Sequence, residues 1–159
     1  DHADWDFGTG DFTIDFWIRF NSTTGTQEMI SVGNDPNGVE IFLLSGTLYF
    51  RINGGATDTT FLWSPLANTW YHIAAVRGGT LTRFFIDGIQ QATSTNSSDI
   101  QTSVGTRIGD SISASRPFNG WLDEFRISKG VARWTQNFDL TTQEYTADPY
   151  TTLLLHFDS

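Results

Sequence analysis

The chain has 159 residues, the size of one domain, and carries 18 acidic against 9 basic residues. Its formal net charge of −9 offers no basic surface that could displace phosphate counterions, which excludes a nucleic-acid binder and disfavours attachment to anionic membranes. The absence of cysteine excludes disulfides and thiol chemistry, and no apolar run approaches the roughly 18 residues of a membrane-inserted helix.

The first predicted strand covers residues 12–20, where apolar and polar residues alternate strictly. This period of two indicates a strand with one buried face. The positions expected to be buried are Phe12, Ile14, Phe16, Ile18 and Phe20. Trp17 and Arg19 are expected to point away from this core face.

Further short strands are predicted along the rest of the chain, separated by turns rich in glycine, asparagine, aspartate and serine. They cover residues 29–32, 39–44, 48–52, 70–77, 81–87, 89–93, 106–108, 121–127 and 153–155. Only residues 130–138 have a pattern that could hold a helical turn. Hairpins at this spacing, with no alternation of strands and helices, are typical of an all-β antiparallel sandwich or barrel.

Four motifs resemble the laminin-G-like, concanavalin A-like jelly-roll domains, in the order and at the spacing of that family. They are DFGTGDFTI at 6–14, TWYHIA at 69–74, FIDG at 85–88 and GWLDEFRIS at 120–128. The stretch SKGVARW at 128–134 resembles the version found in bacteriophage tail, virion-surface and bacterial exported proteins. The resemblance covers about residues 4–138. It implies a two-sheet jelly roll with an extracellular role in binding a carbohydrate or receptor.

The C-terminal segment departs from the pattern of the family. Family members open with a strand like LLLHFD, which here occupies residues 153–158. The chain is therefore either a permuted domain or a window from a tandem array. We expect a jelly-roll core at residues 1–138, then an extended connector and a terminal strand at 139–159. Residues 153–157 are expected to pair within a sheet, either their own or that of a neighbouring subunit.

Aromatic and arginine side chains indicate where a carbohydrate would bind, because sugars present apolar CH faces beside hydroxyls. The candidate ligand-binding residues are Trp17, Arg19, Tyr49, Arg51, Trp63 and Arg116. The first two lie on one predicted strand and the next two on another, so they would form one patch on the concave sheet if these strands are neighbours. The last two lie in loops that could border the patch. Trp121 and Trp134 are expected instead to fill the edge of the core or to pin the helical turn.

A calcium site is the only cofactor site that the sequence indicates. Ca²⁺ is held by about six to eight oxygen ligands. The loop NDPNG at 34–38 offers three suitable side chains, although the same residues are also favoured in a plain turn. The resemblance to pentraxins, which share this fold, adds the carboxylate that follows the strand at 106–108. The candidate ligands are therefore Asp35, Asn37 and Asp110.

Catalysis is not expected. Glycosidases that resemble this chain in fold carry a Glu–Asp–Glu cluster along one strand, whereas the four glutamates of this chain lack that spacing. Asp123 and Glu124, adjacent on one strand, are expected to point to opposite faces. The expected function is a non-catalytic module that binds a glycan or another cell-surface polymer. The alternative is a structural surface or fibre protein that self-associates by strand addition.

Overall fold

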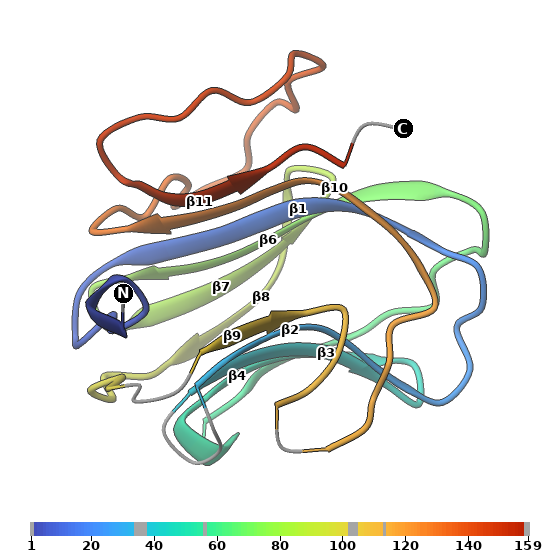
Figure 1. The fold of residues 1–159 in the computed structure, drawn as a ribbon, viewed down its shortest axis with the longest axis horizontal. Helices are drawn as coiled ribbons and strands as arrows, with labels where there is room; N and C mark the ends of the chain where they lie inside the picture. Colours follow the sequence, from blue (N-terminus) through green and yellow to red (C-terminus); the bar gives the residue numbers. More distant parts are fainter. Residues whose placement is uncertain (1, 34–37, 56, 102–104, 113, 158–159) are drawn as a thin grey trace.

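The computed structural model describes residues 2–33, 38–55, 57–101, 105–112 and 114–157, which form two stacked antiparallel sheets (Figure 1). Two short 3-10 segments, η1 (His2–Asp4) and η2 (Asn53–Gly55), accompany the strands. The strands are β1 (Phe12–Phe20), β2 (Thr26–Val32), β3 (Val39–Leu44), β4 (Thr47–Ile52), β5 (Thr59–Leu62), β6 (Trp70–Gly78), β7 (Leu81–Ile86), β8 (Ile89–Thr95), β9 (Thr106–Ile108), β10 (Gly120–Lys129) and β11 (Thr151–Leu155).

The strands are divided between a six-stranded and a five-stranded sheet. The six-stranded sheet has the order β11-β10-β1-β6-β7-β8, and the five-stranded sheet has the order β5-β4-β3-β2-β9. The all-β antiparallel sandwich predicted from the sequence is confirmed. β5 is an additional strand, and residues 130–138 form bends where the sequence allowed a helical turn.

The core lies between the sheets and is filled by the inward side chains of both. All five apolar positions of β1 are fully buried, as their alternation predicted. Phe16 stacks on Phe125 of the neighbouring strand β10, with ring centroids 4.9 Å apart. Phe50 of the other sheet meets Phe12 and Phe84 edge to face. These interdigitating aromatic side chains fix the two sheets against each other.

The segment after β10, residues 131–150, is called the strap. It passes over the outer side of the six-stranded sheet, orange to red in Figure 1, and returns as β11. Trp134 and Phe138 stack with centroids 4.0 Å apart and pack on Phe85, Ala74 and Val76 of the sheet. The strap therefore gives this sheet a second apolar layer, outside the main core.

β11 is the edge strand of the six-stranded sheet and pairs antiparallel with β10 of the same chain. Its inward leucines, Leu153 and Leu155, pack against the main core. The terminal strand thus closes its own sheet in this structure. No helical segment in the described residues is long and apolar enough to cross a membrane.

Candidate functional site

The outer face of the six-stranded sheet carries rows of side chains that run across β6, β1 and β10. The register of the three strands sets four rows: Trp70–Arg19–Trp121, His72–Trp17–Asp123, Ala74–Asp15–Arg126 and Val76–Thr13–Ser128. The polar residues at alternate positions of β1, read in the sequence as facing away from the core, all lie on this face. The strap covers one end of the face and leaves the other end open.

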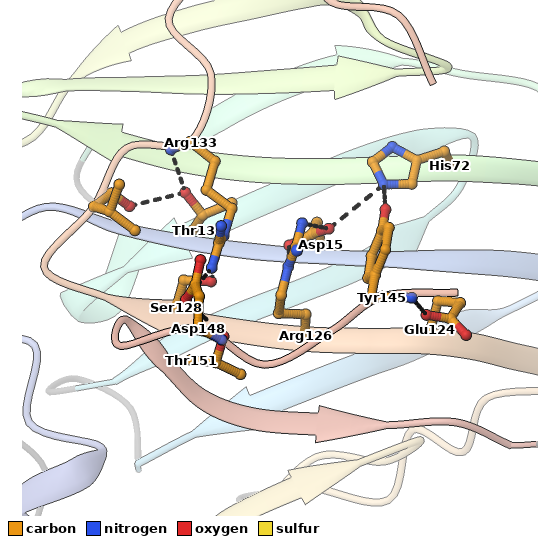
Figure 2. Close-up of polar contacts among 11 residues, drawn as sticks. Thr13, Asp15, His72, Glu124, Arg126, Ser128, Arg133, Tyr145, Asp148 and Thr151 are labelled. Carbon is orange, nitrogen blue, oxygen red and sulfur yellow. Dashed lines mark hydrogen bonds and ion pairs between the residues drawn. The ribbon is translucent and has the colours of Figure 1, made fainter. Parts of the chain in front are cut away.

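At the covered end, a buried polar network ties the strap to the sheet (Figure 2). Nε and Nη2 of Arg126 donate to the two carboxylate oxygens of Asp15 at 3.0 and 2.9 Å, and the guanidinium stacks over the ring of Tyr145 at 4.0 Å. The Tyr145 hydroxyl lies 2.9 Å from Nε2 of His72. Burial, with the nearby Asp15 carboxylate, raises the pKa of Tyr145 above its ordinary value, so the phenol stays protonated. The network therefore fixes the middle of the strap.

A second set of bonds holds both ends of the strap. The Thr13 hydroxyl donates to the carbonyl of Val131 and accepts from the N–H of Arg133, both at 3.0 Å. The Arg133 guanidinium donates to the hydroxyl of Ser128 and to the carboxylate of Asp148, at 2.7 and 2.9 Å. The hydrogen bond from Arg133 to Asp148 holds the pKa of this carboxyl well below its usual range. The strap is consequently a fixed part of the fold.

At the open end, the first of the four rows forms a solvent-facing strip that we call the tryptophan row: Trp70, Arg19 and Trp121. The indoles of Trp70 and Trp121 are 41% and 54% exposed, although tryptophan is usually well covered. The Arg19 guanidinium lies between them, 6.0 and 5.6 Å from the two ring centroids. Because the two tryptophans are separated by one intervening strand, their backbones lie about 10 Å apart.

A cleft of about 470 Å³ adjoins the tryptophan row, a volume typical of ligand sites. We call it the tryptophan cleft. Its walls are Trp17, Trp70, Asp123 and Glu124 from the sheet and residues 141–144 from the strap. Trp17 is held edge to face by His72, with ring centroids 5.5 Å apart. The row and the cleft together present apolar ring surface beside polar groups.

Both carboxylates of the 123–124 pair line this cleft, so the expectation that they point to opposite faces is wrong. The cause is a β-bulge, because the pairing of β1 with β10 shifts between Asp15 and Trp17, and Glu124 adopts a φ of 48°. The extra residue interrupts the strict alternation of the strand. Glu124 then accepts the N–H of Tyr145 at 2.7 Å and lies 2.8 Å from Nδ1 of His156.

A larger cleft of about 620 Å³ lies between the strap and the sheet, lined in part by Arg126, Arg133 and Asp148. Three of its four charged side chains are already paired within the protein, since Arg126 bonds Asp15 and Arg133 bonds Asp148. We therefore place the candidate site at the smaller cleft, whose indoles face solvent.

The single patch expected from Trp17, Arg19, Tyr49 and Arg51 does not exist, because β1 and β4 belong to different sheets. Tyr49 and Arg51 lie on the five-stranded sheet with Phe42 of the adjacent strand. The rings of Phe42 and Tyr49 stack with centroids 4.7 Å apart, and the Arg51 guanidinium covers Phe42 at 4.7 Å. Arg116 covers the same ring at 5.6 Å. Three of the six candidate residues are thus brought together here, while Trp17 lies in the tryptophan cleft and Arg19 in the adjoining tryptophan row.

The cluster around Phe42 on the five-stranded sheet also includes a buried carboxylate, Glu28, that is 3.3 Å from Nη1 of Arg116. Glu40 lies nearby and pairs with Arg51 at 3.4 Å. Burial, with repulsion from Glu40, raises the pKa of Glu28 from 4.5 to about 7 despite the attraction of Arg116. Between these pH values the folded protein holds a proton that the unfolded chain has lost, so its stability falls as the pH rises.

Replacing this side chain, as Glu28→Gln, is expected to flatten that pH dependence. The neutral amide avoids the burial of a charge, so the variant should gain up to about 3 kcal/mol relative to wild type at pH 8 and little at pH 4. Urea unfolding across this pH range measures the difference. Glu144→Gln, at a side chain that is 71% exposed, is the matched control and should follow wild type. If the free energy of unfolding of Glu28→Gln and of wild type changed with pH in parallel, the raised pKa of Glu28 would be contradicted.

Two tryptophans differ from their sequence interpretation, and a third, Trp70, had none. Trp63, predicted to border the binding patch, packs edge to face against Phe20 and Tyr71 at the core. Trp121, predicted to fill the core edge, is among the most exposed large apolar residues described. Trp70 was not singled out. The signal that could have found the last two is strand parity, since Trp121 and Asp123 alternate with the inward Leu122.

The predicted calcium ligands are only partly within the described residues. Asp35 and Asn37 lie outside them. Asp110 accepts the backbone N–H groups of Arg116 and Ser111, each at 2.8 Å, which lowers the pKa of this carboxyl. Within the described ranges no group of three or more His, Cys, Asp and Glu side chains is arranged to hold a metal ion. Calcium binding at Asp35, Asn37 and Asp110 stays a prediction.

A protein-family model matches most of the chain. Residues 1–136 match the model described as the concanavalin A-like lectin/glucanases superfamily. The chain belongs to this superfamily. No curated protein sequence matches the chain. The laminin-G-like, concanavalin A-like resemblance stated from the four sequence motifs is therefore confirmed.

Several solved structures have a similar fold. A protein from Bacteroides ovatus described as carbohydrate-binding superposes with a TM-score of 0.74 and 20% identity, over 94% of this chain and 46% of that one. Domains LG4-5 of the mouse laminin α1 chain superpose with a TM-score of 0.64 and 17% identity, over 86% of this chain and 40% of that one. The CBM40 of Ruminococcus gnavus IT-sialidase, bound to α2,3 sialyllactose, superposes with a TM-score of 0.61 and 13% identity, over 74% of this chain and 73% of that one. The chain spans less than half of the first two structures.

Proposed function

We propose that this concanavalin A-like domain is a non-catalytic, extracellular module that binds a glycan at the tryptophan row and the adjoining cleft. The observation that carries the proposal is the pair of exposed indoles, Trp70 and Trp121, in register on either side of Arg19. Exposed aromatic rings match the CH faces of sugars, and the guanidinium can donate to hydroxyls or ring oxygens. The fold relatives described as binding carbohydrate support the same proposal.

The spacing of the row favours a chain of sugars over a single sugar. The backbones of Trp70 and Trp121 are about 10 Å apart, a distance wider than one pyranose ring. A polymer displayed on a cell or virion surface would supply such a chain. This is the basis for placing the module outside the cell.

The absence of catalysis is part of the proposal and rests on how three of the four glutamates are used. Both oxygens of Glu124 are held by protein groups, the N–H of Tyr145 and the ring of His156. Glu28 and Glu40, on the opposite sheet, are paired with Arg116 and Arg51. A release of reducing ends from a bound polysaccharide, lost in Glu124→Gln, would contradict this part.

Removing either exposed indole tests the site. Trp70→Ala and Trp121→Ala are each expected to weaken glycan binding by about 1–3 kcal/mol, with little change in stability. Binding would be screened on a glycan array and then measured by titration calorimetry. Leu62→Ala, at an 80% exposed side chain on the other sheet, is the matched control and should bind as wild type does. Full binding by both tryptophan variants would refute the proposed site.

A further inference from the structure

We propose that the glycan bound in the tryptophan cleft carries free amino groups, an inference that rests on the proposed function above. The reason is the charge of the cleft. Its walls contain the carboxylates of Asp123, Glu124 and Glu144, while the adjoining tryptophan row contributes one guanidinium, Arg19. The site therefore favours a cation, and the net charge of −9 adds to this preference at long range.

Two of the three carboxylates remain available to a ligand. Oδ1 of Asp123 accepts the N–H groups of Glu124 and Phe157, at 2.8 and 3.3 Å. These bonds fix the orientation of the carboxylate, and Oδ2 has no hydrogen-bond partner among the described residues. The Glu144 side chain is 71% exposed and lies 3.6 Å from Nε2 of His156.

The indoles add a second preference for positive charge. Trp17 and Trp70 line the same cleft as Asp123, so an ammonium group bound beside this carboxylate lies within reach of their rings. A cation against an indole is attracted by the ring quadrupole, and more strongly where the site is partly desolvated.

Arg19 determines where on the ligand the ammonium must lie. The guanidinium occupies the middle of the tryptophan row, between Trp70 and Trp121, and would repel an amine placed there. Hydroxyls and ring oxygens therefore face the row, and the amine faces Asp123 in the next row of the sheet. A uronic acid or sulfated sugar in the cleft would instead meet three carboxylates.

The test compares oligosaccharides of one linkage and length that differ only in charge. Titration calorimetry would use oligomers of glucosamine, N-acetylglucosamine and glucose, and an oligouronate as the anionic probe. The glucosamine oligomer is expected to bind about tenfold tighter than the neutral oligomers, which is the scale of one partly desolvated cation–aromatic contact. The uronate should show no binding. Added salt should reduce the advantage of the glucosamine oligomer.

The variant Asp123→Asn isolates the charge. It keeps the oxygen that caps the two backbone N–H groups, so the fold should be unaffected while affinity for glucosamine falls to that of the neutral oligomers. Asp139→Asn removes the same charge from an exposed strap residue that lines the larger cleft and not the tryptophan cleft. This variant should retain the preference for the glucosamine oligomer. Equal affinity for all oligomers, or tightest binding of the uronate, would overturn this inference and leave glycan binding intact. Failure of every oligomer to bind would overturn both.

Discussion

Replacing Asp15 with alanine is expected to lower the free energy of unfolding by about 3–5 kcal/mol. Asp15 is fully buried, and its two oxygens bind the Arg126 guanidinium at 3.0 and 2.9 Å. Removing the carboxylate leaves a buried cation without its anion, which costs more than the ion pair itself contributes. The melting temperature should fall by roughly 10 °C, and calorimetry together with urea unfolding measures both quantities.

The double variant Asp15→Ala/Arg126→Met is the internal control. Because it removes both charges and keeps apolar volume under the strap, it should recover much of the loss. Hydrogen exchange of the strap, residues 131–150, should accelerate in the single variant and less in the double one. A single variant within about 0.5 kcal/mol of wild type would show that the network does not hold the strap.

Ending the chain after Tyr150 is expected to destabilise it by at least about 3 kcal/mol, because β11 is removed. The truncation uncovers one side of β10 and removes Leu153 and Leu155 from the core. The truncated chain should keep the oligomeric state of the full-length chain, since β11 pairs within its own chain. Thermal unfolding and sedimentation of the truncated and full-length chains measure the two effects.

The three leucines of β11 supply a matched comparison. Leu153→Ala and Leu155→Ala remove side chains that pack on the core, whereas Leu154 lies beside Arg126 on the outer face and should be less sensitive. Equal losses of stability at all three positions would contradict the inward orientation of Leu153 and Leu155. A truncation that leaves the melting temperature unchanged but dissociates a polymer would instead favour strand donation between subunits.

The sequence was sufficient to predict the fold because its strands alternate cleanly. The face of β1 could be assigned residue by residue, since all five apolar positions share one parity and are buried. Hairpin turns then marked the neighbouring strands along the chain. Strand β5 was not predicted, because its inward residues, Thr59 and Phe61, do not form an apolar run.

The site was less accessible to sequence reasoning, because it depends on which strands become neighbours. Trp17 and Tyr49 look alike as outward aromatics, yet the sheet order places them on opposite sides of the sandwich. The bulge at Glu124 depends on a positive φ that period-two alternation cannot reveal. Nothing in the composition of the strap shows that it covers one end of the sheet and leaves the tryptophan row open.

The most direct test of glycan binding at this site is an NMR titration that follows the indole N–H signals of the six tryptophans. With a short glucosamine oligomer, or a glycan found on the array, we expect the signals of Trp17, Trp70 and Trp121 to shift with one saturating curve. The signals of Trp5 and Trp63, which pack against the main core, and of Trp134, which packs from the strap onto the sheet, should stay in place. Shifts confined to Trp63 or Trp134, or none at saturating ligand, would contradict the account.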